Sequence, residues 1–350
     1  MTTRRAAITD VAAAAGVSRS TVSNYLNHPE LLSASTRERL ARVIAELQFV
    51  PSDAARKISS GDTGTIGYIA YEFTNPFSGV IADAIERRAS ESGRTVMIAN
   101  SAGSARRQRE YLELFERKRV AGIIVATLDD VEPRLEELRE RGMSTVITGR
   151  RSASDLIASV SADDATGGYL AARHLLDLGR RRIVFVGGPF RVAQIAERFD
   201  GASRAVGETP GATLTAVRAD ERTMDAGFAA GVELATSGSP LPDGVFAVND
   251  LVGLGVVRGL LSCGIEVPRD VAVIGFDGDD IAEVAAIPLS TIRTSGEAVG
   301  ETAVDLLLAE LGVGGPVPDR HRLVPPTLVA RASTVADVDA HAARRNGSAS

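Results

Sequence analysis

The 350-residue sequence has little cysteine, few aromatic residues and no long apolar run. Its one cysteine, Cys263, excludes a disulfide framework and a cysteine-based metal cluster. The four histidines stand far apart, which excludes a zinc site of the HExxH type. No stretch approaches the roughly 18 apolar residues of a transmembrane helix, and the N-terminus lacks the apolar run of a signal peptide. We therefore expect a cytoplasmic chain with no metal, no cofactor and no membrane contact.

The loops that bind nucleotides in common enzyme classes are also missing. A Walker A loop needs Gly-Lys, but the sequence has two lysines and each follows an arginine. Gly253, Gly255 and Gly259 resemble a dinucleotide-binding loop, but Arg258 stands where the strict fingerprint has glycine. That stretch also begins inside a helical pattern, so we interpret its glycines as contacts of a helix packed on a sheet. The sequence does not predict an enzyme.

The charge is divided unevenly along the chain. The net charge is −6, yet residues 1–60 carry about +3 and the remaining residues about −9. The length predicts two or three domains. A basic N-terminal segment on an acidic body indicates that this segment contacts a polyanion.

Three short helical patterns fit the first 50 residues. The first runs over residues 9–15, with Thr9 as N-cap and Gly16 as the stop. The second opens at Ser18, and the third opens near Ser33 or Ser35. Two short helices joined by a glycine-containing turn are typical of a helix-turn-helix motif, whose second helix enters the major groove of DNA.

From residue 64 onward, strand patterns alternate with helix patterns. Apolar runs such as residues 65–70, 122–126, 182–186 and 271–276 alternate with amphipathic segments of 10–16 residues. Repeated βα units predict two doubly wound parallel sheets, with ligands at the carboxyl ends of the strands.

These segments together resemble the lactose-repressor (LacI/GalR) family over nearly the whole chain. The resemblance is strongest in Ile8-Thr9-Asp10-Val11-Ala12, Ala15-Gly16-Val17-Ser18 and Ser20-Thr21-Val22-Ser23. It implies an all-α helix-turn-helix head over residues 1–50 and a hinge helix over residues 51–64. It also implies a bilobed, periplasmic-binding-protein-like core over residues 65–334, followed by a flexible tail over residues 335–350. The first lobe is then expected over residues 65–162 plus 295–320, and the second over residues 163–290 plus 321–334.

The resemblance implies a palindromic operator that is read in its major groove and at its central minor groove by a homodimer. Ala55 would let two hinge helices approach each other, and Ile58, where the family usually has leucine, would wedge between base steps. Asn24 stands where the family usually has arginine, and asparagine pairs best with adenine. The predicted DNA-contacting residues are Thr9, Ser18, Arg19, Ser20, Thr21, Ser23, Asn24, Asn27, Ser33, Thr36, Ala55 and Ile58.

The resemblance also implies a small-molecule effector between the lobes. The predicted effector-binding residues follow strand patterns: Glu72, Asn75, Phe77, Ser101, Thr127, Arg198, Arg222, Asn249, Asp250 and Asp277. Their carboxylates, guanidinium groups and amides suit the hydroxyls of a carbohydrate. Asn249 and Asp277 have a second reading as caps of the helices that follow. Gly149 stands where the family often has aspartate, and Thr294 where it often has glutamine.

The sequence thus predicts a DNA-binding transcriptional repressor whose operator affinity is controlled by a sugar or sugar derivative. Two alternatives remain open: a solute-binding receptor of the same bilobed fold without DNA function, and a regulator of nucleoside or purine genes. Loss of DNA retention when residues 1–60 are removed would separate the repressor from the receptor.

Overall fold

The structure is a computed structural model that describes residues 6–49, 64–127, 131–219, 221–313, 315 and 319–335. The chain divides into two units, one with the N-terminal helices and the other with nearly all of the α/β core. Of the expected hinge over residues 51–64, all but Gly64 lie outside the described residues, and so does the expected tail beyond Val335.

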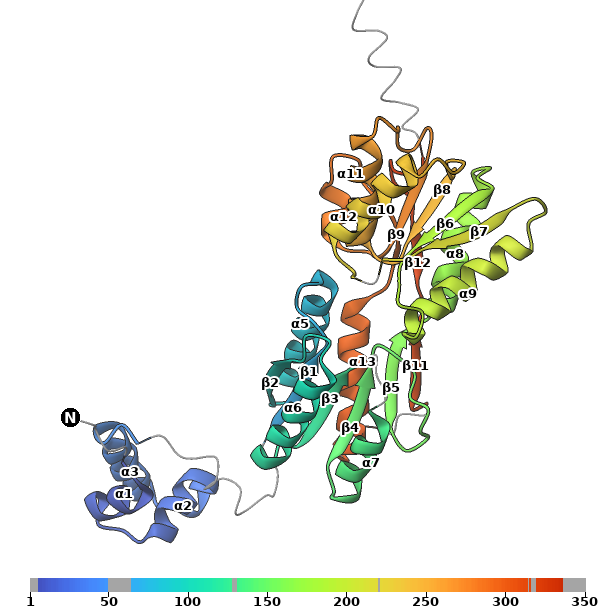
Figure 1. The fold of residues 1–350 in the computed structure, drawn as a ribbon. Coiled ribbons are helices and arrows are strands. Elements are labelled where there is room, and N and C mark those ends of the chain that lie inside the picture. The colour runs from blue at the N-terminus through green and yellow to red at the C-terminus, as the bar shows by residue number, and fades with distance from the viewer. Residues whose placement is uncertain are drawn as a thin grey trace, which may run out of the picture. The chain divides into compact units, whose positions relative to one another are not determined.

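The head consists of three α-helices and a short 3-10 turn (Figure 1). They are α1 (Ile8–Ala15), α2 (Arg19–Asn27), η1 (Pro29–Leu31) and α3 (Ala34–Glu46). Their apolar faces enclose a small core around Val11, Val22 and Leu40, each fully buried. This burial holds together helices that are too short to be stable alone.

The helix boundaries of the head follow local capping. The Oγ atoms of Ser18 and Ser33 accept hydrogen bonds from backbone amides three residues on, as expected for N-caps. Gly16 ends α1 with φ of 61°, a left-handed conformation that suits glycine. The expected cap at Thr9 is wrong: Thr9 lies inside α1, and Asp10 instead accepts a hydrogen bond from the amide of Ala7.

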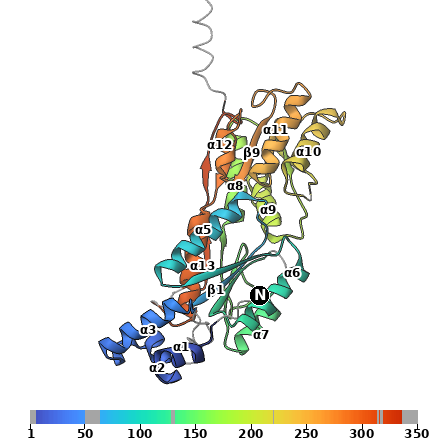
Figure 2. The same cartoon turned by 90° about the vertical axis from the view of Figure 1, so that its left-hand side faces the viewer.

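The first lobe of the core is built on a six-stranded sheet of order β11-β5-β4-β3-β1-β2. Its strands are β1 (Thr65–Ala70), β2 (Thr95–Asn100), β3 (Gly122–Ala126), β4 (Ser144–Thr148), β5 (Ala158–Ala162) and β11 (His321–Val324). Its helices are α5 (Pro76–Glu91), α6 (Ala105–Lys118), α7 (Glu132–Glu140) and α13 (Gly296–Glu310). α13 packs on β3, β4 and β5 and runs beside α5 (Figures 1 and 2).

The second lobe has a sheet of order β12-β10-β9-β8-β6-β7. Its strands are β6 (Arg182–Val186), β7 (Thr213–Val217), β8 (Gly244–Ala247), β9 (Ala272–Asp277), β10 (Ser290–Arg293) and β12 (Thr327–Val329). Its helices are α8 (Asp164–Asp177), α9 (Ala193–Gly207), α10 (Met224–Thr236), α11 (Asp250–Ser262) and α12 (Asp280–Val284). The strands β10, β9, β8, β6 and β7 run parallel, as expected, whereas β12 is antiparallel to β10.

The chain passes between the lobes three times within the described residues: from β5 to α8, from β10 to α13, and from β11 to β12. The expected lobe boundary is therefore partly wrong. Residues 321–324 form β11, which pairs with β5 of the first sheet, although we placed residues 321–334 in the second lobe. The last crossing returns the chain to the second sheet.

Glycines let the helices of the second lobe approach closely. A Cβ on Gly255 would lie 2.1 Å from the carbonyl oxygen of Met224, and one on Gly259 would lie 2.4 Å from that of Phe228. Both neighbours belong to α10, so these glycines of α11 contact a helix rather than the sheet. Gly253 does face the sheet, with Ala247 of β8 and Leu289, the residue before β10, nearest. The three glycines therefore do serve helix packing, but Gly255 and Gly259 pack on a helix and not on a sheet, so the expected helix-on-sheet contact holds for Gly253 alone. No described helix is both long and apolar enough to cross a membrane.

Candidate functional site

The second helix of the head presents a polar surface. In α2 and at its N-cap, Ser18, Arg19, Ser20 and Asn24 are exposed, and Thr21 and Ser23 are half-buried. Of the other predicted DNA-contacting residues, Thr9 in α1 and Ser33 before α3 are exposed, and Thr36 in α3 is half-buried. Val22 points the other way, into the head core, with no exposed surface. The sequence pattern thus gives α2 one apolar face toward the core and one face of hydroxyl, amide and guanidinium groups.

Two hydroxyl clusters sit at the N-termini of α2 and α3. The Oγ of Ser18 lies 2.7 Å from that of Ser20 and 2.8 Å from Oγ1 of Thr21. The Oγ of Ser33 lies 2.9 Å from Oγ1 of Thr36. Helix N-termini with exposed hydroxyls bind phosphate oxygens well, so both clusters suit the DNA backbone.

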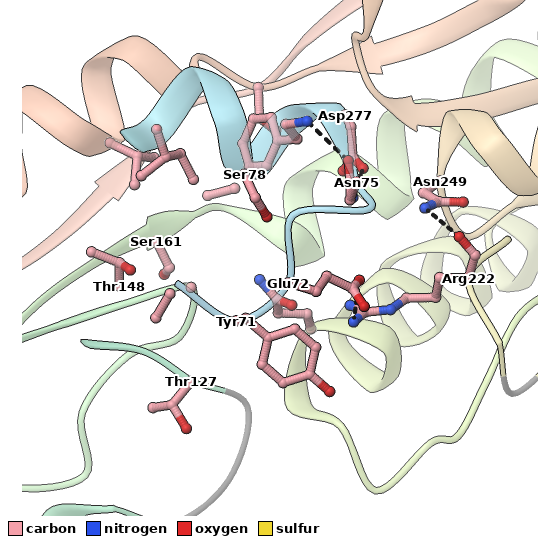
Figure 3. A pocket seen from close by; sticks show the side chains of 18 of the residues that line it. Tyr71, Glu72, Asn75, Ser78, Thr127, Thr148, Ser161, Arg222, Asn249 and Asp277 are labelled. Atoms are coloured by element: carbon pink, nitrogen blue, oxygen red, sulfur yellow. Dashed lines mark hydrogen bonds and ion pairs between the residues drawn. The ribbon is translucent and has the colours of Figure 1, made fainter. Parts of the chain in front are cut away.

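A cavity of about 90 Å³ lies between the two lobes of the core (Figure 3). Because one water molecule needs about 10–15 Å³ of cavity volume measured in this way, the cavity holds several waters or a compact ligand. Eight of the predicted effector residues line it: Glu72, Asn75, Phe77, Thr127, Arg198, Arg222, Asn249 and Asp277. Most of them come from loops and strand ends that are far apart in the sequence, whereas Phe77 lies in the first turn of α5 and Arg198 lies inside α9.

Ser101 and Asp250 do not line this cavity. The Oγ of Ser101 donates to the carbonyl oxygens of Ala70 and Tyr71. The Oδ2 of Asp250 accepts from the amides of Gly278 and Asp279, at 2.9 and 2.8 Å. Both side chains are buried and hold loops in place, outside the cavity that the other described effector candidates line. Ala55 and Ile58 lie outside the described residues, as does the side chain of Asn27.

Two polar contacts join the lobes across the cavity (Figure 3). The Nδ2 of Asn75, in the first lobe, donates to Oδ2 of Asp277 in the second at 3.1 Å. Nη2 of Arg222, in the second lobe, lies 2.9 Å from Oε1 of Glu72 in the first. A ligand that changes either contact changes how the lobes are held together.

Arg198 is enclosed by partners within the second lobe. Its Nε donates to Oδ1 of Asp164 at 2.7 Å, and Nη1 donates to the carbonyl oxygen of Val248 at 2.5 Å. Nη2 lies 3.6 Å from Oδ1 of Asp277, and the guanidinium carbon lies 3.6 Å from the ring centroid of Phe276. Arg198 therefore lines the cavity while it neutralises buried carboxylates.

Several carboxyl groups here have raised pKa values. Burial raises the pKa of Asp164 to about 6, although Arg198 opposes this shift. Burial and the charges of Asp277 and Asp280 raise the pKa of Asp279 to about 7. Burial also raises the pKa of Asp277, whose φ of 104° lies in a region that favours glycine. Such strain and perturbed titration are typical of functional sites.

The helix N-termini test whether Asn249 and Asp277 act as helix caps, the alternative interpretation of these two residues. Asn249 does cap α11, because its Oδ1 accepts from the amide of Val252 at 2.9 Å. Its Nδ2 also reaches the carbonyl oxygen of Arg222 at 3.4 Å. The N-cap of α12 is Asp279 rather than Asp277.

Sequence reasoning missed several lining residues: Tyr68, Tyr71, Ser78, Ile81, Thr148, Ser161 and Gln194. Thr148 ends β4, so the strand-end rule already pointed to it, and the rule would have found Ser161 as well if β5 had been recognised. Gln194 lies in the first turn of α9, and no motif marks it.

Comparison with known proteins covers both units. Residues 7–52 match the family described as bacterial regulatory proteins, lacI family, and residues 172–334 match a periplasmic binding protein-like domain. The chain is 32% identical over 308 residues to the HTH-type transcriptional repressor PurR of Vibrio vulnificus, covering 87% of this chain and 92% of that protein. This chain belongs to the lacI family of bacterial regulatory proteins.

Two solved structures extend the likeness. The lac repressor dimer bound to operator and the anti-inducer ONPF matches with a TM-score of 0.82 and 25% identity, covering 95% of this chain and all of that one. The complex of the transcriptional regulator CelR with cellobiose matches with a TM-score of 0.69 and 30% identity, covering 94% and 100%. The lacI-family member described here is a DNA-binding repressor under effector control, as the sequence predicted.

Proposed function

We propose that this repressor binds a palindromic operator as a homodimer, with one α2 in the major groove of each half-site. The exposed amide of Asn24 would read a base edge, and Arg19 with the two hydroxyl clusters would contact phosphates. The hinge residues Ala55 and Ile58 would lie at the central minor groove, as expected from the sequence. Because operator DNA is chromosomal, the proposed place of action is the cytoplasm.

Exposed apolar side chains support the proposed homodimer. Met97 and Ile98 of the edge strand β2 are 37% and 43% exposed, and Val80 of the neighbouring α5 is 49% exposed. Monomers rarely leave apolar edge strands open to solvent. In analytical ultracentrifugation the full chain should sediment as a dimer, and Ile98→Lys should shift it toward monomer. A wild-type monomer at micromolar concentration would contradict the proposal.

The proposed effector is a carbohydrate. The cavity combines carboxylate, amide, guanidinium and hydroxyl groups with the rings of Tyr71 and Phe77. Such a lining offers hydrogen bonds to many hydroxyls and an apolar face for a sugar ring. The similarity to CelR, which was solved with cellobiose, supports the same class of ligand. A purine base or nucleoside is the second candidate, because the same rings would stack on a heterocycle.

The observation that supports effector control most directly is that cavity residues come from both lobes and already contact each other. A ligand that replaces the Asn75–Asp277 hydrogen bond, or that bridges the lobes beside the Glu72–Arg222 ion pair, would favour one lobe arrangement over another. We propose that the operator prefers a different arrangement. DNA and effector then change each other's affinity by the same factor.

A two-part experiment tests this function. Thermal-shift screening of the full chain against sugars, purine bases and nucleosides should find a ligand that raises the melting temperature. Gel shifts with an operator selected from random DNA should show binding that this ligand alters. Removal of residues 1–63 should abolish the gel shift and keep the thermal shift. A chain that binds a sugar but no DNA would instead be a solute-binding receptor.

A further inference from the structure

The charges that line the cavity are already paired. Among the described lining residues, Arg198 and Arg222 are balanced by the carboxylates of Asp277 and Glu72. Arg198 also donates to Asp164 and to the carbonyl oxygen of Val248, and it stacks on a ring. Neither arginine is left to neutralise an anion that enters, and separating either from its carboxylate would leave a charge unpaired.

The helix N-termini at the cavity are also occupied. Asn75 Oδ1 accepts from the amide of Phe77 at the start of α5, and Asn249 Oδ1 accepts from the amide of Val252 in α11. Backbone amides at helix N-termini are the usual alternative to arginine for binding phosphate. Here the N-cap side chains of Asn75 and Asn249 already accept a hydrogen bond from one of these amides in each helix. Fewer amides are therefore left to bind a phosphate group.

One neutral group in the wall has no partner. Thr148, at the end of β4, is 1% exposed and lines the cavity, and its Oγ1 makes no hydrogen bond within the described part of the chain. A buried hydroxyl without a partner lowers the stability of the folded chain, so a ligand group that hydrogen-bonds to it is favoured. Ser161 and Ser78 add further neutral hydroxyls to the wall (Figure 3).

Next to Thr148 the wall carries no carboxylate of its own. Residue 149 is a glycine with φ of 89°, and a Cβ there would lie 3.7 Å from Nε2 of Gln194. The amide of Gln194, from α9 of the second lobe, thus faces the end of β4 in the first lobe. This end of the cavity offers a hydroxyl and an amide, which both bind uncharged hydroxyl or carbonyl groups.

We propose that the cavity selects an uncharged, unphosphorylated carbohydrate, one of whose hydroxyls hydrogen-bonds to Oγ1 of Thr148. The inference rests on the proposed carbohydrate effector and narrows it. A sugar phosphate brings about −1.5 to −2 charges, for which the described lining holds no unpaired cation. A neutral sugar leaves both ion pairs in place and satisfies the orphan hydroxyl.

Matched pairs of a neutral sugar and its phosphate test whether the cavity prefers the uncharged ligand. The full chain is titrated by calorimetry with D-ribose and D-ribose 5-phosphate, D-glucose and D-glucose 6-phosphate, and cellobiose and its 6-phosphate. The neutral member of any pair that binds should bind at least tenfold more tightly than its phosphate. Tighter binding of a phosphate would overturn the inference while the carbohydrate effector stands. If neither class binds, the carbohydrate effector itself fails, and this inference fails with it.

Thr148→Val tests the subsite, and Thr145→Val is its matched control. Thr145 lies on the same strand, is fully buried and also has an unpartnered Oγ1, but it does not line the cavity. Both variants replace a hydroxyl with a methyl of similar size, so both should fold. Thr148→Val should raise the Kd for the neutral sugar about tenfold, and Thr145→Val should leave it unchanged. Equal Kd values for wild type and Thr148→Val would overturn the role of Thr148.

Discussion

Arg222 and Glu72 form an ion pair that joins the two lobes, with Nη2 2.9 Å from Oε1. The guanidinium carbon of Arg222 also lies 5.0 Å from the ring centroid of Tyr71, in the first lobe. Both charged side chains are partly shielded from water, at 20% and 26% exposure. The pair thus fastens the cleft at the same place where the effector is proposed to bind.

A double-mutant cycle on Glu72→Gln and Arg222→Met should show that these side chains are coupled. We expect a coupling free energy of about 1 kcal/mol in urea unfolding followed by circular dichroism, because the pair is partly buried. The exposed Arg106–Glu110 pair on α6 is the control, with an expected coupling of about 0.3–0.5 kcal/mol. Additive effects at positions 72 and 222 would show that the pair does not fasten the lobes.

Replacing Arg198 should lower the free energy of unfolding, whatever it does to effector binding. Arg198→Met leaves the buried carboxyl groups of Asp164 and Asp277 without their cation, so we expect a loss of about 3–5 kcal/mol. Arg204→Ala, an exposed arginine on the same helix, should cost less than about 1 kcal/mol. Equal losses in urea unfolding would show that the buried pairing contributes nothing.

Stability should fall as pH rises because Asp279 has a raised pKa. Its pKa is about 7 in the folded chain and 3.8 as an unperturbed group, so the folded state binds more protons between these values. Folding stability from this group is therefore full below about pH 4 and is lost as pH approaches 7, by at most about 1.4 kcal/mol per pH unit.

The substitution Asp279→Asn removes the titrating carboxyl group and so tests whether it causes this pH dependence. The melting temperature of the variant minus that of wild type should rise between pH 5 and pH 8. Asp164, whose pKa is about 6, titrates in both proteins, so its contribution largely cancels in the difference. A difference that stays constant over this range would contradict the raised pKa of Asp279.

Asn24→Ala should relax base discrimination at one position of each half-site. We expect a loss of about 1–3 kcal/mol in discrimination there, because Asn24 is exposed on α2 and its amide would pair with a base. Arg19→Ala is the contrast and should weaken all operators alike, as a phosphate contact does. Binding to a library of single-base operator variants separates the two. A uniform loss for Asn24→Ala would place its amide on phosphate.

Local signals in the sequence predicted much of the fold. Ser18 and Ser33 cap helices and Gly16 ends one, as predicted, because helix caps and stops depend on only a few neighbouring residues. The βα alternation predicted both sheets, because buried parallel strands are apolar runs. β5 was missed, since its Ala-Ser-Val-Ser-Ala sequence has neither an apolar run nor large side chains. The pairing of β11 with β5 depends on residues about 160 positions apart, which no local pattern encodes.

Those cavity residues were predicted whose location depends only on following a strand of the parallel sheet. Polar residues after parallel strands gather at one sheet edge, which brought Asn75, Arg222 and Asp277 to the cavity. Position does not decide which way a side chain turns. Ser101 and Asp250 follow strands as expected, yet their side chains bind nearby backbone groups instead. The engagement of Arg198 with Asp164 likewise depends on helix packing between α8 and α9.

The central claim is that a ligand in the cleft controls binding of DNA by the head. Its most direct test is the operator Kd of the full chain, measured by fluorescence anisotropy with and without a saturating neutral sugar that stabilises the core. The account predicts a change of at least about fivefold, and an equal factor in the sugar Kd when operator is present. The same operator Kd with and without the sugar would contradict it.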